Sequence, residues 1–310
     1  MVNTKRGSQP IRFNKGLPQG DALCPRLFTL CLNPVAWKLN STEGYRISKP
    51  ISSKVTSLLY VGDLNVFAAS ERKLSRVLRS TKAAMEDISL HWNPKKCSVQ
   101  IHVKRGVQMQ ESEDLKLDQS SVIGYLKEET QYKFLGVPER LLQEEKLVLE
   151  CVPRVYLQRL SIIWSSPLPD HNCILASNQF AMPVLSYLTW TQHWRLKELR
   201  QIDRDAWKII VESAGGKYLL GSTALVYLPR EKGGRGLCSA ENEYKMTKIK
   251  AVIKLYRNTD PTIQLVRDFE ERAVDQGHQS LVKEATKYAN EVGISVHLSH
   301  PHPTSSNNKG

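Results

Sequence analysis

The sequence predicts an α+β fold with a mixed amino-terminal half and a mainly helical remainder. Before about residue 150, short apolar β-branched runs alternate with helical ones, and after it apolar residues recur at helical spacing. No internal repeat and no long linker interrupts this pattern. We therefore expect an α/β unit over 1–150, an α-helical unit over 151–296, and a disordered tail over 297–310.

The first helix is predicted over 26–39. Its apolar residues fall on one helical face: Leu27, Phe28, Cys31, Leu32 and Val35. Pro25 suits a first helical turn, whereas Pro34 is expected to end or kink the helix. Two apolar runs within 55–69 lie on either side of Gly62-Asp63, and this composition predicts a tight β-hairpin.

A second helix is predicted to begin after Ser70, a suitable N-cap, and to run until Asn93-Pro94 stops it. An apolar strand should follow over 98–103. The polar, irregular stretch 104–131 is expected to be an excursion on the surface.

Helices are predicted throughout the second half, with further runs over 240–257 and 261–292 after a glycine-rich turn at 233–236. One helix carries five cations that could contact a nucleic-acid backbone or could simply be a solvated face: Arg195, Lys197, Arg200, Arg204 and Lys208. The nearby Trp190 and Trp194 are expected to belong to the core rather than to a stacking platform.

The charge balance favours a polyanionic partner, because 44 Lys and Arg against 31 Asp and Glu give a net charge of +13. No apolar stretch approaches the roughly 20 residues of a membrane-spanning helix, so we expect no membrane insertion. The start of the chain has no apolar export signal, and the six cysteines form no CxxC pair. These features predict an intracellular protein, with nothing that separates nucleus from cytoplasm.

Four strings occur in one order: GLPQGDALCPRLF at 16–28, LLYVGDLNVFA at 58–68, LHWNPKKCSVQ at 90–100 and YKFLGV at 132–137. Together they resemble the reverse transcriptase domain of a non-LTR retrotransposon, entered part-way through the palm. PREKGGRGL at 229–237 resembles the thumb-region block of the same group. The resemblance therefore implies a partial polymerase palm, an antiparallel sheet with helices, followed by a helical thumb-like region.

The resemblance also implies a role for each candidate site residue, and each of these residues has a purely structural interpretation as well. Gly16, Pro18, Gln19 and Gly20 would form the loop against template base and incoming nucleotide, or only a Gly-Pro turn before a helix. Lys96 would assist the leaving pyrophosphate, or is a solvated lysine. The primer-grip hairpin would contain Tyr132, Phe134, Leu135 and Gly136, a stretch that composition alone describes as a short strand.

Metal binding is where the sequence departs from the family. Such polymerases bridge two Mg²⁺ ions with an Asp from an earlier palm strand and the first Asp of a Tyr-x-Asp-Asp turn. Here the turn reads Tyr60-Val61-Gly62-Asp63, so glycine replaces the essential ligand, and the fifteen residues before Gly16 contain no Asp or Glu. Asp63 is thus a vestigial catalytic and weak metal-binding candidate, or part of an ordinary hairpin tip, and we expect no productive Mg²⁺ binding.

These observations predict a truncated relative of RNA-directed DNA polymerases that is inactive by itself and has RNA and DNA as partners. Two alternatives stay open. The chain could be a non-catalytic basic module that binds RNA or DNA. It could also be a remnant that folds poorly, in which case residues 55–69 should exchange their amide hydrogens rapidly.

Overall fold

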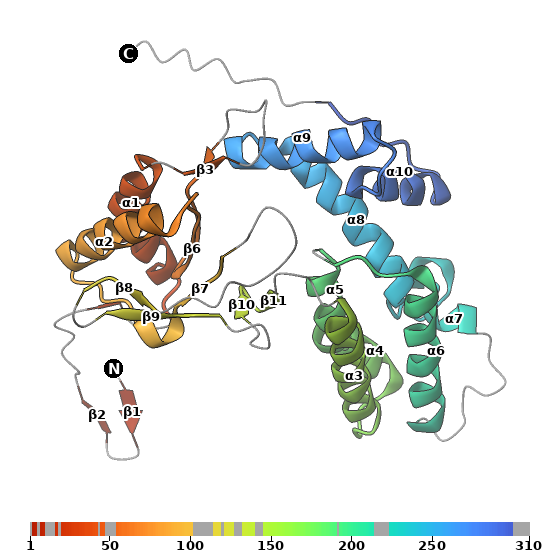
Figure 1. Cartoon of the computed structure of the whole chain (residues 1–310). Helices are drawn as coiled ribbons and strands as arrows, with labels where there is room; N and C mark the ends of the chain where they lie inside the picture. The colour runs from red at the N-terminus through yellow and green to blue at the C-terminus, as the bar shows by residue number, and fades with distance from the viewer. Residues whose placement is uncertain are drawn as a thin grey trace, which may run out of the picture. The chain divides into compact units, whose positions relative to one another are not determined.

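In the computed structural model, the structure describes residues 2–4, 7–9, 16–17, 20–42, 44–46, 54–101, 114–118, 121–126, 132–139, 145–190, 192–213 and 223–299. The chain forms two compact units, residues 1–141 and 142–310, which are described separately below (Figure 1). The first unit combines helices with small sheets and the second is helical, so the predicted α+β class is confirmed. No helix in the described ranges is long and apolar enough to cross a membrane.

The centre of the first unit is a hairpin packed on two helices. Strands β5 (Ser57–Tyr60) and β6 (Asp63–Val66) pair antiparallel, with Leu59 opposite Leu64. Their apolar side chains pack against α1 (Cys24–Asn40) and α2 (Glu71–Asp87), around the buried Leu32, Val35 and Leu39. The predicted hairpin and both predicted helices are therefore confirmed.

Helix α1 continues through Pro34, contrary to our expectation, and ends at Asn40. A proline inside a helix deprives the carbonyl four residues earlier of its donor. That carbonyl belongs to Leu30, an exposed residue, so water can satisfy it. Burial of Val35 and Leu39 beyond the proline stabilises the last turns, because each removes apolar surface from water.

Helix α2 begins where predicted, since the Ser70 side chain accepts a hydrogen bond from the Lys73 amide at 3.3 Å. It ends earlier than predicted, at Asp87 rather than at Asn93-Pro94. Ser89 has a φ of +58° and the Leu90 amide returns to the carbonyl of Met85 at 2.9 Å. A left-handed residue of this kind reverses the chain and terminates a helix without any proline.

The prediction of a surface excursion over 104–131 is wrong for its described residues. Strands β8 (Leu115–Lys116) and β9 (Val122–Tyr125) pair with each other, and β9 also pairs parallel with β7 (Ser98–Val99). Leu115, Leu117 and Ile123 are buried between this sheet and α2, so the segment contributes a core of its own. Strand β7 is shorter than the predicted run over 98–103, whose last two residues lie outside the described ranges.

The remaining strands of the first unit form three short two-stranded ladders. These are β1 (Val2–Thr4) with β2 (Gly7–Gln9), β3 (Tyr45–Arg46) with β4 (Lys54–Val55), and β10 (Tyr132–Phe134) with β11 (Val137–Glu139). A 3₁₀ turn, η1 (Pro94–Lys96), precedes β7.

The second unit is a set of helices around one core. In chain order they are α3 (Glu145–Trp164), α4 (Asp170–Ala176), the π-helical turn η2 (Ser177–Ala181), α5 (Met182–Thr189), α6 (Leu196–Ser213), α7 (Thr223–Tyr227), the 3₁₀ turn η3 (Arg230–Lys232), α8 (Ala240–Arg257), α9 (Pro261–Asp275) and α10 (Leu281–Glu291). Their core includes Tyr156, Leu160, Trp194 and Tyr244, all almost fully buried. The single helical run expected over 261–292 is interrupted by Gly277, whose φ is +77°.

Two side-chain contacts fix helix α8 at its ends. The Asp203 carboxylate accepts hydrogen bonds from the Ala240 amide at 2.7 Å and the Ser239 hydroxyl at 2.8 Å, at the start of α8. Arg267 donates to the Leu255 carbonyl at 2.9 Å, near the end of α8. Each contact satisfies backbone or capping groups that a helix terminus otherwise leaves unpaired.

Candidate functional site

The tip of the β5–β6 hairpin carries the candidate metal ligand. Tyr60 pairs with Asp63, so the two-residue turn is Val61-Gly62 and Asp63 is the first residue of β6 rather than part of the turn. Val61 has a φ of +52°, whereas Gly62 is not in the left-handed region. The strain therefore falls on a β-branched residue, which adopts this conformation rarely.

The surroundings of Asp63 do not fit a pair of Mg²⁺ ions. Asp63 is exposed, and Gly62 beside it supplies no side chain. Within the described ranges, no three His, Cys, Asp or Glu side chains converge as a metal site would require. Hard divalent cations need several oxygen ligands, so this hairpin tip offers one carboxylate where at least two are needed.

The hairpin tip lies beside the beginning of α1. A Cβ atom added at Gly62 would lie 3.8 Å from the Phe28 ring, an ordinary van der Waals contact. The backbone and the space at this position would therefore accept a larger residue, including aspartate. The glycine is not required by the fold of the hairpin.

The glycine loop precedes α1 in the same unit. Gly16 and Gly20 have φ values of +88° and +102°, which favour glycine, and among the described residues neither has a neighbour that a Cβ would meet. Asp21 accepts a hydrogen bond from the Leu23 amide at 2.8 Å, just before the helix begins. The candidate residues Pro18 and Gln19 lie outside the described residues.

The third and fourth strings form two separate features. Lys96 is exposed at the end of η1, a turn in which the Asn93 side chain accepts from the Lys95 amide at 3.1 Å. The primer-grip candidates form the β10–β11 hairpin, whose turn residues Leu135 and Gly136 both have positive φ, 51° and 78°. Two positive φ values define a type I′ turn, so this string is a hairpin and not only a strand.

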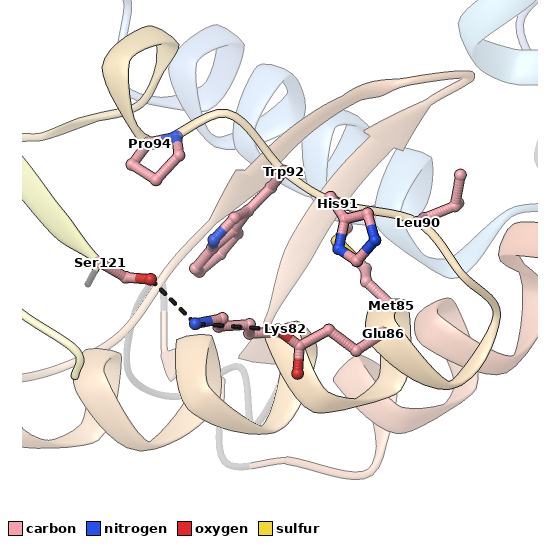
Figure 2. Close-up of a pocket in the computed structure, with 8 residues that line it drawn as sticks. All are labelled: Lys82, Met85, Glu86, Leu90, His91, Trp92, Pro94 and Ser121. Atoms are coloured by element: carbon pink, nitrogen blue, oxygen red, sulfur yellow. Dashed lines mark hydrogen bonds and ion pairs between the residues drawn. The ribbon is translucent and has the colours of Figure 1, made fainter. Parts of the chain in front are cut away.

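A cavity of about 240 Å³ lies beside η1, between the end of α2 and Ser121 (Figure 2). Trp92, Pro94 and Met85 give it apolar walls, and the Trp92 Nε1 has no hydrogen-bond partner in the described structure. The Lys82 ammonium donates to Asp118 and, at 2.9 Å, to the Ser121 hydroxyl. These residues were not predicted from the sequence, because the contacts join positions more than 35 residues apart.

Lys82 is not an open anion-binding group. Its hydrogen bond with Asp118 raises the pKa of the ammonium, and Glu86 lies 3.8 Å away on the next helical turn. An ammonium that already has carboxylate partners attracts a phosphate less strongly. The cavity therefore combines apolar walls with polar side chains and a cation already paired with carboxylates, and Lys96 is not among its lining residues.

In the second unit, the basic helix α6 has fewer available cations than its sequence suggests. Arg200 donates to Glu241 at 2.7 and 3.1 Å, and Lys208 to Asp205 at 3.0 Å. Arg204 donates to Gln201 on the same helix. Arg195 and Lys197 are exposed. Phosphates could contact the cations along the whole of α6 only if the Arg200–Glu241 and Lys208–Asp205 pairs opened.

The two tryptophans near α6 differ from each other. Trp194 is buried in the core, as expected. The expectation for Trp190 is wrong, since it is exposed and the Lys254 ammonium lies 4.7 Å from its ring centroid. The difference arises because α5 directs Leu185 and Thr189 to the core, and Trp190, about 100° further around the helix than Thr189, lies outside that buried face.

The thumb-like block at 229–237 forms a closely packed turn. Asn178 donates to the Gly236 carbonyl at 2.8 Å and accepts from the Cys238 amide at 2.9 Å, which attaches the turn to η2. The Arg230 guanidinium lies against the His171 ring, and Arg235 lies 3.6 Å from Asp170. The turn is therefore held by both backbone and side-chain contacts.

The first unit is thus a mixed α/β domain in which a glycine loop, a helix and a carboxylate-bearing hairpin follow one another. Residues 1–138 match the family described as reverse transcriptase (RNA-dependent DNA polymerase), and this part of the chain is a reverse transcriptase domain. The resemblance seen in the sequence is confirmed to that extent. No curated protein matches the chain.

Replacing Val61 with asparagine should stabilise the hairpin tip by about 1 kcal/mol, because asparagine tolerates positive φ far better than valine. Val61 is exposed, so the substitution loses little packing. Amide exchange of residues 57–66 should slow by roughly fivefold. Leu58→Asn, an exposed strand position outside the turn, is the control and should not slow exchange.

Proposed function

We propose that this chain descends from the RNA-directed DNA polymerases of non-LTR retrotransposons and does not polymerise by itself. The observation that carries the proposal is Gly62, which stands beside Asp63 at the tip of the β5–β6 hairpin. The inherited reaction is in-line attack of a primer 3′ hydroxyl on the α-phosphate of a nucleoside triphosphate. This reaction depends on converging carboxylates that the hairpin does not supply.

The surviving family features are positioning features rather than chemical ones. Gly16 and Gly20 keep the left-handed backbone that a close approach to a ligand requires. Lys96 remains exposed, and the primer-grip string remains a hairpin. Positioning contributes to rate only when the reacting groups are also activated, so these features support binding more than turnover.

Primer extension on an RNA template, with Mg²⁺ or Mn²⁺ present, tests the proposal. The purified chain should give no nucleotide incorporation above background. Asp63→Asn is the matched control, because incorporation that this variant leaves unchanged comes from a contaminant. Incorporation by the wild-type chain that Asp63→Asn abolishes would show that one carboxylate of this hairpin is sufficient, and the proposal would be wrong.

Gly62→Asp supplies the carboxylate that this position of the hairpin lacks. Its φ is ordinary and the nearest atom to an added Cβ is 3.8 Å away, so the variant should fold normally. If this variant alone extends a primer, Gly62 is the residue that removed activity.

A second function, binding of RNA and DNA without catalysis, is supported by the net charge of +13. Backbone contacts release counterions, so affinity should fall with salt by a slope of about 0.7 for each phosphate contact with a single strand. Filter binding across a salt series measures this slope, and a flat profile would contradict the proposal. We also propose an intracellular location, since the scattered cysteines suit a reducing compartment.

A further inference from the structure

The second unit exposes three aromatic side chains along one face of η2 and α5. Phe180, Tyr187 and Trp190 are 62%, 53% and 36% exposed. Their separations of seven and three residues place them on the same side of the helical path, away from the buried Leu185. We call these three residues the aromatic ridge. Large exposed rings that recur on one face indicate an interaction surface rather than incidental exposure.

Cations lie at both ends of the aromatic ridge. At one end, the Arg159 guanidinium of α3 donates to the Phe180 carbonyl at 2.7 Å. At the other end, the Lys254 ammonium of α8 lies 4.7 Å from the centroid of the Trp190 ring. Lys250 and Arg257 are exposed four residues before and three residues after Lys254, on the same face of α8.

Acidic residues are absent from the parts of the sequence that build this surface. There is no Asp or Glu in 151–164 of α3, in 171–197 including η2 and α5, or in 244–259 at the end of α8. Helix α5 packs against both α3 and α8, so the three segments are neighbours within one unit (Figure 1). The surface therefore combines exposed rings with an unbalanced positive charge.

We propose that the aromatic ridge binds single-stranded nucleic acid, with bases stacked on its rings and phosphates at the flanking cations. Aromatic side chains in a cationic groove are the usual platform for single strands, because each unpaired base has a free π-face. A duplex offers no such face along its length, since its bases stack on each other. Ten residues of helical path span about 15 Å, which is enough for several nucleotides.

This inference deepens the second proposed function, since it names the form of nucleic acid and the residues that bind it. It does not depend on the hairpin of the first unit. Loss of all salt-dependent binding would contradict the second function, whereas normal binding by variants of the aromatic ridge would contradict only this inference.

The experiment uses the full chain and a fluorescently labelled twelve-nucleotide oligothymidylate, with anisotropy as the readout. Phe180→Ala and Tyr187→Ala should each weaken binding by roughly five- to hundredfold, the range found when a stacking ring is removed. Neither variant should change the slope of affinity with salt. Lys254→Gln should instead lower that slope by about 0.7, because it removes one phosphate contact.

Matched controls separate stacking from general damage. Phe269→Ala removes an equally exposed ring on α9, and Lys287→Gln an exposed cation on α10, and both should bind as wild type. Tyr187→Phe keeps the ring and should bind as wild type. An abasic strand of the same length should bind the wild-type chain weakly. Phe180→Ala should bind this strand with the same weak affinity as the wild type.

Three results would overturn the inference. The first is equal binding by wild type, Phe180→Ala and Tyr187→Ala. The second is an equal loss in Phe269→Ala. The third is tighter binding of a twelve-base-pair duplex than of the single strand. If the ridge variants abolish self-association in sedimentation while strand binding persists, the ridge joins two copies of the chain instead.

Discussion

Gly234→Ala is expected to destabilise the second unit by about 3 kcal/mol, because the glycine leaves no space for a methyl group. A Cβ at this position would lie 2.0 Å from the carbonyl oxygen of Leu228 and 2.4 Å from its carbonyl carbon. Both are backbone atoms. The turn around them is fixed by hydrogen bonds from the Gly234 amide to the Pro229 carbonyl at 3.0 Å and from the Gly236 amide to the Leu228 carbonyl at 2.9 Å.

Gly233→Ala is the matched control at the neighbouring position. Gly233 has a φ of +80° but no atom within 4 Å of an added Cβ, so alanine there meets only backbone strain, worth about 1 kcal/mol. Urea unfolding followed by the fluorescence of Trp164 and Trp194, both in the core of this unit, measures the two losses. Equal losses would show that close packing at Gly234 does not constrain the turn.

These two glycines show what a sequence pattern can and cannot establish. The sequence predicts a glycine-rich turn at 233–236, and that turn is present. Which glycine needs positive φ and which needs space depends on the approach of Leu228, and no local pattern contains that information.

Elements defined by local chemistry were predicted well. The N-cap at Ser70, the hairpin over 55–69 and the helix over 240–257 all rest on contacts within a few residues, and all are confirmed. Elements defined by distant partners were not. Leu115 and Ile123 lie in a polar stretch whose composition predicts a loop. They form a sheet because they pair with each other and because β9 also pairs with Ser98–Val99.

The candidate site divides in the same way. Gly62 and Asp63 are adjacent in the sequence, so the missing carboxylate could be recognised before the structure was known. The cavity beside Lys82 depends on Asp118, and the aromatic ridge depends on which face of α5 is buried. Both required the packing of separate segments, which neither composition nor spacing specifies.

The second unit is expected to unfold steeply as the pH rises above 10. Burial raises the pKa of five of its tyrosines: Tyr156, Tyr227, Tyr244, Tyr256 and Tyr288. For Tyr256 and Tyr288 the pKa rises to about 12. A raised pKa means that the folded unit keeps these protons after the unfolded chain, with a tyrosine pKa of about 10, has released them.

The sign of the effect follows from this difference in bound protons. Between about pH 10 and 12 the unfolded state binds fewer protons, so each such tyrosine lowers the free energy of unfolding by about 1.4 kcal/mol per pH unit. Below pH 10 this stabilisation is fully present. Lys248 acts in the opposite direction, because burial lowers its pKa, and its contribution increases with pH only up to about 10.5.

Absorbance of tyrosinate and helical circular dichroism, recorded together from pH 8 to 12, test this expectation. Both signals should share one cooperative step, in addition to any absorbance change from the other six of the eleven tyrosines, because the five buried phenols can ionise only when the unit opens. Tyr288→Phe removes one ionisable group. It keeps the aromatic ring, whose centroid lies 6.0 Å from that of the Tyr244 ring. The step should therefore move to higher pH in this variant. If the absorbance of all eleven tyrosinates instead develops gradually while the helical signal is unchanged, the five buried phenols ionise in the folded unit, and burial does not control their ionisation.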